Sequence, residues 1–363
     1  MASRQTYLGY ADAAAQELTS KWYGTDGPSK WFGLTDFWRS PNLMTALTDL
    51  MQLTGSRDYL ATADNALAVS SPYFVVGESP TYYDDECWWG ACFLRLAQLT
   101  GDASWFSVPK TIFTDLQGGW DDVVGGGVWW KRCPKSYKCN KNEKGSIENE
   151  LYMDIAMTLY AYAAAGDRQM YLDATNQTWQ WMQALIESNG LVQGSLNQDG
   201  TINRKNPARP YNQGVILGPL WALYKVTGDT TYLDRAEKIV QAALDTMTWP
   251  DGILQEVCEK DGNCGTDLNP PLFKGVFVRY LGEFAQRLAT LGDPARQQAA
   301  QRYAAFLQHN ADAVWANYQP GHIFGMDWHT RHPNYKPTDV FMYDGCVQSS
   351  ALDLFVAAAL VSQ

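Results

Sequence analysis

The chain lacks the features of a membrane-spanning protein and those of a nucleic-acid-binding protein. Its 363 residues contain no run close to the roughly 18 to 20 consecutive apolar residues that a membrane helix requires. Lys and Arg number 28 against 39 Asp and Glu, which gives a net charge of −11, and so acidic a protein is poorly suited to bind a phosphate backbone. We therefore expect a soluble globular protein without a nucleic-acid partner and without a membrane span.

The sequence also offers little material for a metal site. Its four histidines all fall between residues 309 and 332, far along the chain from its close cysteine pairs, so no zinc-type spacing joins them. His329 and His332 share a loop with Asp327 but form a weak metal candidate. The acidic stretch 261–267 does not match an EF-hand pattern. We expect no metal and no cofactor.

The seven cysteines fall into two close pairs and three isolated residues. Cys133/Cys139 and Cys258/Cys264 each lie in a loop rich in Gly, Asn or Lys, and this spacing can close a small disulfide ring in an oxidising compartment. Residues 1–9 do not resemble a signal peptide, so we expect a secreted protein whose leader has been removed. Three further cysteines stand in apolar helical surroundings and are expected to be buried as small hydrophobic residues: Cys87, Cys92 and Cys346.

Aromatic residues are abundant. They make up 13% of the chain, with 15 Trp and 20 Tyr, and the tryptophan content is roughly three times that of an average domain. So many flat side chains indicate stacking against a flat ligand, and sugar faces are the usual candidate.

A short motif recurs five times and predicts the architecture. It reads Leu-Thr-Gly-Ser-Arg-Asp-Tyr-Leu at 53–60, and related forms begin at residues 99, 164, 226 and 290. Its glycine suits the left-handed residue that follows a helix, and the Asp or Ser after it suits the N-cap of the next helix. Each copy therefore predicts a tight turn between two helices.

Amphipathic segments flank each turn, with apolar residues at three- and four-residue steps. We expect one all-α domain over residues 1–363, an (α/α)6 toroid in which six outer helices surround six inner ones. The connections are short at one end of this ring and long at the other, and long loops on a rigid scaffold usually carry function. The twelve predicted helices are 4–22, 41–53, 57–70, 85–99, 103–116, 148–165, 168–188, 211–226, 230–247, 272–290, 295–313 and 346–361.

The entries of the predicted inner helices are rich in Asn, Asp, Trp and Tyr, which hydrogen-bond to sugars and stack on them. The sharpest group is Asp84-Asp85-Glu86, three acids at a helix start within an aromatic stretch. They could simply cap the helix and interact with its dipole. Crowded carboxyls also suit glycosidase chemistry, because crowding separates their pKa values and keeps one protonated while its neighbour is ionised.

Several stretches along the chain occur in an order that is typical of one enzyme family. They are Pro41-Asn42, residues 82–89, 126–130, 146–152 and 273–279, together with the Thr-Gly-Asp turns. On these stretches the sequence resembles glycoside hydrolase family 76, the endo-α-1,6-mannanases, whose fungal relatives act on cell-wall mannan and on glycolipid anchors. The Asp-Asp-Glu-x-Trp-Trp pattern is the most specific of the matches.

The resemblance implies an (α/α)6 fold and retaining cleavage of α-1,6-mannan, with Asp84 as nucleophile and Asp85 as general acid/base. A covalent mannosyl intermediate on Asp84 would then be hydrolysed by a water that Asp85 activates. Cys87 stands where the family often has Ala or Ser, and we interpret it as a packing change. The segment around 133–144 is an unusual insertion at the rim of the expected cleft.

Sugar contacts are expected from the remaining helix entries and from the Gly-rich turn before Trp129 and Trp130. Glu148 and Glu150 could be helix caps or sugar contacts, and the Asn residues could equally close helix starts. Lys274 and Arg279 are five residues apart on one helix, so at most one of them is expected to point into the cleft. The candidate substrate-binding residues are Trp38, Asn42, Tyr83, Trp88, Trp130, Asn149, Asn212, Lys274 and Asp344.

Other functions remain open. A wall transglycosidase of the same family would pass the mannosyl group to a sugar acceptor, but residues 361–363 lack the spacer and apolar tail of a lipid-anchor signal, which favours hydrolysis. The intact Asp84-Asp85 pair argues against a non-catalytic mannan-binding protein, and the scarcity of His argues against a sugar epimerase or a uronic-acid lyase. We expect an extracellular monomer, either free or held at the cell wall, with α-1,6-mannan as its partner.

Overall fold

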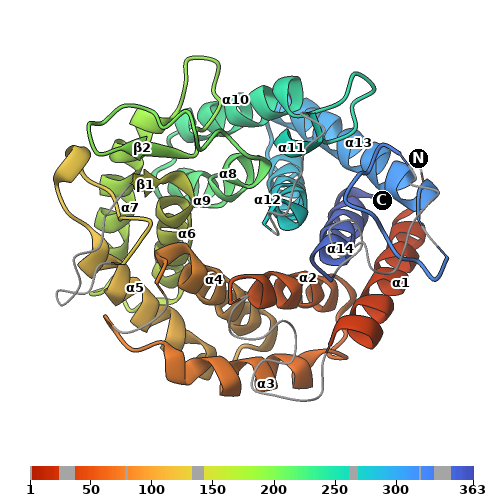
Figure 1. Cartoon of the computed structure of the whole chain (residues 1–363), viewed down its shortest axis with the longest axis horizontal. Coiled ribbons are helices and arrows are strands. Elements are labelled where there is room, and N and C mark those ends of the chain that lie inside the picture. The colour runs from red at the N-terminus through yellow and green to blue at the C-terminus, as the bar shows by residue number, and fades with distance from the viewer. Residues whose placement is uncertain are drawn as a thin grey trace.

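The computed structural model describes residues 2–23, 37–77, 81–132, 143–260, 269–318, 320–330 and 345–363. Its helices form a closed ring with an inner and an outer layer (Figure 1), which confirms the predicted toroid. Each inner element packs on its neighbours, and α14 closes the ring against α2. The inner elements are α2 (Arg39–Thr54), α4 (Tyr83–Thr100), α6 (Ser146–Tyr162), the consecutive α8 (Pro210–Val215) and α9 (Leu217–Thr227), α12 (Pro270–Ala289) and α14 (Gly345–Val361).

The outer helices lie against the inner ones in sequence-adjacent pairs, except that α1 packs on α14 across the chain ends. They are α1 (Arg4–Trp22), α3 (Leu60–Ser70), α5 (Ser107–Gly119), α7 (Arg168–Met182), α10 (Thr231–Thr246) and α13 (Pro294–Ala316). The smaller elements are the 3-10 turns η2 (Ser71–Tyr73), η3 (Ala103–Phe106), η4 (Val123–Gly125) and η5 (Gln183–Leu185), the short helix α11 (Val257–Lys260) and the strands β1 (Glu143–Gly145) and β2 (Ser195–Asn197). Every predicted helical segment contains an observed helix, whereas α11 and the antiparallel pair β1–β2 were not predicted.

The repeated turn has the predicted geometry at three of its copies. Gly55, Gly101 and Gly228 follow their helices with φ of 77°, 72° and 73°, and each N–H donates to the carbonyl four residues earlier. The prediction is wrong for Gly166 and Gly292, which have no left-handed φ. There the inner helix ends before the glycine, at Tyr162 in α6 and at Ala289 in α12, so the chain turns without it.

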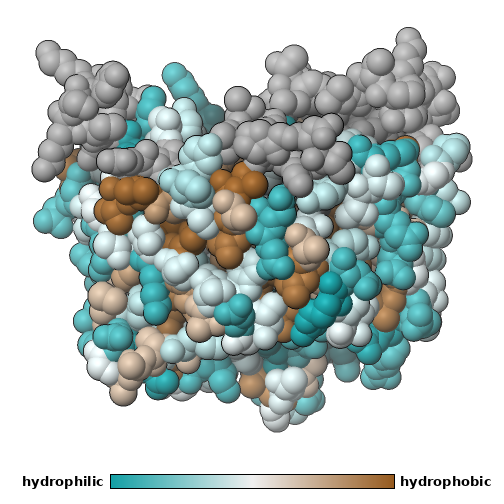
Figure 2. All heavy atoms as spheres, turned by 90° about the horizontal axis from the view of Figure 1, so that it is seen from below, coloured by the Kyte–Doolittle hydropathy of each residue, from teal (hydrophilic) through white to brown (hydrophobic). Residues whose placement is uncertain are grey.

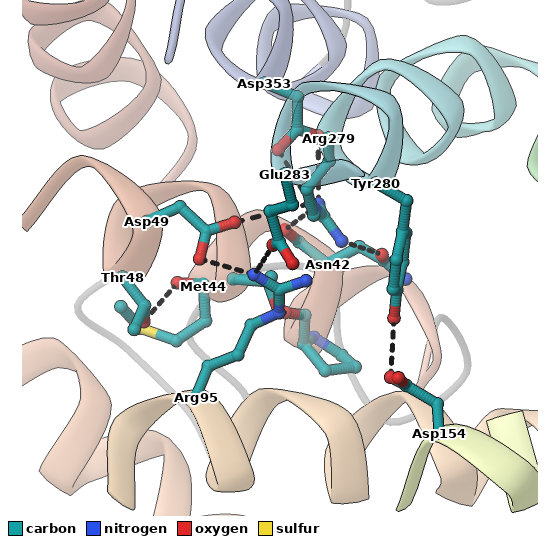
Figure 3. Close-up of polar contacts among 12 residues, drawn as sticks. Asn42, Met44, Thr48, Asp49, Arg95, Asp154, Arg279, Tyr280, Glu283 and Asp353 are labelled. Atoms are coloured by element: carbon teal, nitrogen blue, oxygen red, sulfur yellow. Dashed lines mark hydrogen bonds and ion pairs between the residues drawn. The ribbon is translucent and has the colours of Figure 1, made fainter. Parts of the chain in front are cut away.

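An ionic network, buried at Arg279 and Asp353 and partly exposed at its other charged members, ties the inner helices together (Figure 3). Arg279 of α12 donates two hydrogen bonds of 2.9 Å to the carboxylate of Asp353 on α14 and one of 3.1 Å to Asn42 Oδ1 on α2. Arg95 of α4 donates to Asp49 Oδ1 at 2.8 Å and also to Glu283 of α12. These contacts join four inner helices, and they account for the predicted sugar contact Asn42, whose side chain is committed to Arg279.

The network borders an open cavity of about 540 Å³ that is lined mainly by the C-terminal halves of the inner helices. On the outer side of the ring seen in Figure 2, hydrophobic residues form small separate groups among hydrophilic ones, which is normal for a protein surface. None of the helices within the described residues is long and apolar enough to cross a membrane.

The three isolated cysteines are buried, as predicted. Cys87, Cys92 and Cys346 are buried thiols, and burial raises the pKa of Cys92 to about 12. Cys133, Cys139 and Cys264 lie outside the described residues, so both disulfide pairings stay predictions.

We expect iodoacetamide, applied to the denatured and unreduced protein, to modify Cys87, Cys92 and Cys346 alone, and to modify all seven cysteines after reduction. Denaturation is needed because buried thiols with raised pKa values react slowly. Intact-mass spectrometry counts the added groups. Seven additions before reduction would contradict both disulfides and, with them, the expected oxidising compartment.

Candidate active site

The N-terminal ends of the inner helices surround a cleft of about 460 Å³. It lies at the end of the ring where the sequence placed the functional face. The structure brings together there five of the predicted site residues: Trp38, Asp84, Asp85, Trp88 and Trp130. Glu148, which the sequence left open as a helix cap or a sugar contact, also lines the cleft. Other lining residues were not among the predicted sugar contacts; they include Glu143, Lys205, Asn206, Arg209, Tyr211 and Phe273.

One wall of the cleft is aromatic. The rings of Tyr211 and Phe273 stack with centroids 4.1 Å apart and planes 15° apart. Trp38 lies between this pair and Trp88, at 6.2 Å from Phe273 and 6.0 Å from Trp88, and its indole N–H donates to Asn269 Oδ1 at 3.1 Å. These flat faces come from α2, α4, α8 and α12, so a sugar ring can stack on a wall that the scaffold holds in place.

The acid pair lies in the first turn of α4, opposite the tryptophan of the Gly-rich turn. Tyr82 is the N-cap residue of α4, so Asp84 does not hold the capping position that one interpretation gave it. The indole N–H of Trp130 donates to Asp84 Oδ2 at 3.2 Å. Asp84 Oδ1 is buried and has no hydrogen-bond partner within the described chain, so this carboxylate oxygen is not committed to another protein group.

The two aspartates differ in acidity. Burial raises the pKa of Asp84 to about 6, and the hydrogen bond from Trp130 opposes this rise. Burial and the neighbouring charge of Asp84 raise the pKa of Asp85 to about 8. Between these values Asp84 is ionised and Asp85 is protonated, which is the combination of nucleophile and acid that a retaining glycosidase needs.

The third acid of the cluster has a structural partner. Arg132 Nη2 donates to Glu86 Oε1 at 3.0 Å, and the same guanidinium pairs with Asp115 of α5 and lies 4.2 Å from the ring centroid of Tyr83. Tyr83, a predicted sugar contact, is therefore buried beside this ion pair and does not line the cleft. The cluster fixes the first turn of α4, because breaking a buried ion pair is costly.

A buried ammonium group holds the Gly-rich turn that carries Trp130. Lys144 Nζ donates to the carbonyl oxygens of Asp121, Val123 and Gly126 at 2.6 to 2.8 Å, and to the carboxylate of Asp121 at 2.7 Å. Trp129 is buried, and its indole N–H also donates to Asp121, at 2.7 Å. Trp130 is thus the one of the two adjacent tryptophans that reaches the cleft.

The remaining predicted contacts hold backbone segments or other side chains instead of lining the cleft. Asn149 brackets Val128, accepting from its N–H at 2.8 Å and donating to its carbonyl at 3.1 Å. Asn212 accepts from the N–H of Arg209 at the start of α8. Lys274 is buried and donates to Glu259 at 2.9 Å and to the carbonyl of Met326 at 2.6 Å.

Asp344 lies outside the described residues, as does His332 of the weak metal candidate. His329 pairs with Asp251 at 3.0 Å and stacks on Trp249, while Asp327 accepts from the N–H of His329. Within the described parts of the chain, no three His, Cys, Asp or Glu side chains are grouped so that they could hold a metal ion.

Two further carboxyls line the cleft. Glu143 of β1 accepts from Ser195 Oγ and Asn203 Nδ2, both at 2.6 Å, and its charge raises the pKa of Asp84. Glu148 of α6 accepts from the N–H of Gly145, and its buried Oε2 has no hydrogen-bond partner among the described residues. Sequence reasoning missed Glu143, because its position depends on the pairing of β1 with β2, two three-residue strands that are far apart in the sequence.

Comparison with known proteins agrees with this geometry. The sequence matches the profile described as glycosyl hydrolase family 76 over residues 6–362. Mannan endo-1,6-alpha-mannosidase DFG5 of Candida albicans is 27% identical over 59% of this chain and 49% of its own length. Mannan endo-1,6-alpha-mannosidase DCW1 of Saccharomyces cerevisiae is 25% identical over 75% of this chain and 59% of its own length. The chain thus spans about half the length of the curated relatives it matches.

Solved structures show the same fold. The α-1,6-mannanase GH76A of Salegentibacter sp. HEL1_6 superposes with a TM-score of 0.80 at 23% identity and covers 98% of this chain and 100% of its own. An inactive variant of that enzyme, with two consecutive aspartates changed to asparagine, is in complex with α-1,6-mannotriose (22% identity, 98% and 100% coverage, TM-score 0.81). Dfg5 from Chaetomium thermophilum, in complex with glucosamine, covers 99% of this chain and 92% of its own at 17% identity and a TM-score of 0.80.

Proposed function

Because the chain belongs to glycosyl hydrolase family 76, we propose that it is an endo-acting α-1,6-mannanase that retains the anomeric configuration. The observation that carries this proposal is the pair Asp84 and Asp85, which stands in an aromatic cleft with separated pKa values. The choice of α-1,6-mannan as substrate is supported by relatives named as mannan endo-1,6-alpha-mannosidases and by an α-1,6-mannanase of the same fold.

In the first step, the Asp84 carboxylate attacks the anomeric carbon of a mannose unit stacked on the aromatic wall. The bond from that carbon to O-6 of the next unit breaks, and the protonated Asp85 gives its proton to the departing oxygen. In the second step, a water gives a proton to Asp85 and attacks the same carbon, which releases Asp84. Two inversions at one carbon give net retention.

The assignment of the two roles follows from their acidity. Asp84 loses its proton at the lower pH, and a nucleophile must be ionised. The paired aspartates whose replacement accompanies inactivity in the Salegentibacter enzyme are likewise consecutive in sequence. We also propose that the protein acts outside the cell, on the strength of the two predicted disulfide loops and of the polymeric substrate.

The product anomer and the product sizes test this proposal together. We expect proton NMR, recorded in the first minutes on unbranched α-1,6-mannan, to show newly formed α-anomeric reducing ends, since mutarotation has not yet mixed the anomers. Chromatography should show a range of oligosaccharides at early times. Release of mannose alone, or of β-anomeric ends, would contradict endo-cleavage or retention respectively.

The pH dependence of kcat/KM should be bell-shaped. Asp84 must be ionised to attack, so the rate should rise as the pH increases through about 6, and Asp85 must be protonated to donate, so it should fall as the pH increases through about 8. In Trp130→Phe the indole hydrogen bond that lowers the pKa of Asp84 is lost, and the acidic limb should move to higher pH. An acidic limb unchanged in this variant would show that Asp84 is not the group titrating there.

A further inference from the structure

Two cationic side chains lie in the cleft beside its carboxyls but pair with none of them. Arg209 and Lys205 line the same cavity as Asp84, Asp85 and Glu143. The guanidinium of Arg209 lies over the ring of Phe273, 5.4 Å from its centroid. Across the described part of the chain, neither side chain donates a hydrogen bond or forms an ion pair.

Three buried cations near the cleft behave differently. Lys144 pairs with Asp121 at 2.7 Å, Arg132 pairs with Glu86 at 3.0 Å, and Lys274 pairs with Glu259 at 2.9 Å. In a chain with a net charge of −11, carboxylates outnumber cations, so an unpaired arginine in a cleft lined by carboxyls is unusual. Its position on the aromatic wall keeps its donors available for a ligand.

The chemistry of these groups fits an anion. A guanidinium stacked on an aromatic ring presents a fixed fork of N–H donors that matches the oxygens of a phosphate or carboxylate, and a lysine adds a mobile point charge. The hydroxyl groups of a neutral hexose do not require two full positive charges. Two cations from one segment suit a phosphoryl group, which carries more charge and more acceptor oxygens than a carboxylate.

We propose that the cleft accepts α-1,6-mannan chains that carry a phosphoryl group, and that Arg209 and Lys205 bind its oxygens. This inference rests on the proposed function and names its substrate more closely. The cations precede α8, while the acid pair stands on α4, and α6 lies between these two helices in the ring (Figure 1). The phosphorylated unit therefore binds on the α8 side of the cleft, and the bond that is cleaved lies at the acid pair on α4.

Competition kinetics tests the inference. Neutral α-1,6-mannotetraose and its singly phosphorylated positional isomers react in one tube at low salt, and mass spectrometry follows the loss of each. The ratio of loss rates equals the ratio of kcat/KM values. We expect at least one isomer to be preferred about tenfold or more, and this ratio to fall towards one in Arg209→Gln, in Lys205→Gln, and for the unchanged protein in 0.5 M salt, because ions screen the attraction.

Matched variants separate local from general effects. Lys110→Gln removes a positive charge from the exposed face of α5, outside the cleft, and should keep the ratio of the unchanged protein. Arg209→Lys retains the charge but loses the planar fork, and should give an intermediate ratio. Circular dichroism spectra identify any variant that fails to fold, and the ratio is then taken from the remaining variants.

The outcomes distinguish the two levels of the proposal. If the neutral tetraose is cleaved and no phosphorylated isomer is preferred, the phosphoryl site is wrong while the proposed function stands. If neither sugar is cleaved, the proposed function fails. The phosphoryl site is then tested separately by calorimetry of the phosphorylated tetraoses with the unchanged protein and with Arg209→Gln. Weaker binding in the variant would support the site, and equal binding would contradict it. An equal preference for a tetraose that carries a uronic acid would overturn the choice of phosphoryl over carboxylate.

Discussion

Replacing Asp84 by Asn is expected to lower kcat on unbranched α-1,6-mannan by roughly 10⁴-fold or more, because the amide cannot form the glycosyl ester. Asp85→Asn removes the acid that protonates the leaving oxygen, and a loss of about 10²- to 10⁴-fold is expected. The two variants should differ on a mannosyl fluoride, whose leaving group needs no proton. Asp85→Asn should form the intermediate from it, and Asp84→Asn should not.

The matched control for this pair is Asp102→Asn. Asp102 caps η3 at the opposite end of α4, where its carboxylate accepts from the N–H of Ser104 at 2.8 Å. Its replacement should change kcat by less than about threefold, with a stability loss of roughly 1 kcal/mol or less, as for other caps. Activity within a few-fold of normal in Asp84→Asn or Asp85→Asn would show that the chemistry has been assigned to the wrong residues.

Arg279→Met is expected to lower the free energy of unfolding by about 3 to 5 kcal/mol, because it leaves the buried carboxylate of Asp353 without its partner. The ion pair joins α12 to α14, and its third hydrogen bond reaches Asn42 on α2 (Figure 3). With Arg279 present, burial already raises the pKa of Asp353 to about 6. Urea unfolding followed by circular dichroism measures the loss.

Two further variants make the test specific. Arg287→Met breaks the ion pair between Arg287 and Glu283, in which the arginine side chain is 36% exposed. This variant should lower the free energy of unfolding by about 1 kcal/mol or less. The double variant Arg279→Met/Asp353→Leu removes both buried charges and should recover much of the stability lost in the single variant. Equal losses in Arg279→Met and Arg287→Met, or no recovery in the double variant, would contradict the role given to this network.

The helical ring could be predicted because its signals are local. A glycine after an apolar-periodic segment and a capping Asp or Ser after it specify a helix end and a helix start within a few residues, as at Gly101 and Asp102. Gly166 and Gly292 show the limit, since the sequence has the same appearance there while the helices end earlier. The strands β1 and β2 are too short to show periodicity, and their pairing joins distant segments.

The sequence predicted those site residues whose type allows few roles at the start of an inner helix. Asp84, Asp85 and three of the tryptophans stand in the cleft, because an acidic and aromatic helix entry on the inner ring has few other uses. Polar residues at the same entries have many uses. Asn149 holds a neighbouring turn and Lys274 pairs with Glu259 of the short helix α11, and these partners come from connecting segments whose positions the sequence does not predict. Glu143 enters the cleft by that same unpredicted route, on the short strand β1.

The central claim is that the protein hydrolyses α-1,6-mannan through Asp84. The most direct measurement is mass spectrometry of the products formed from unbranched α-1,6-mannan in water enriched in heavy oxygen, with Asp84→Asn in parallel. We predict short oligosaccharides that each carry one heavy oxygen at the new reducing end, and none in the variant. Unlabelled chains of altered length would show transfer to sugar acceptors instead of water, and intact polymer with the unchanged protein would contradict the assignment of hydrolysis altogether.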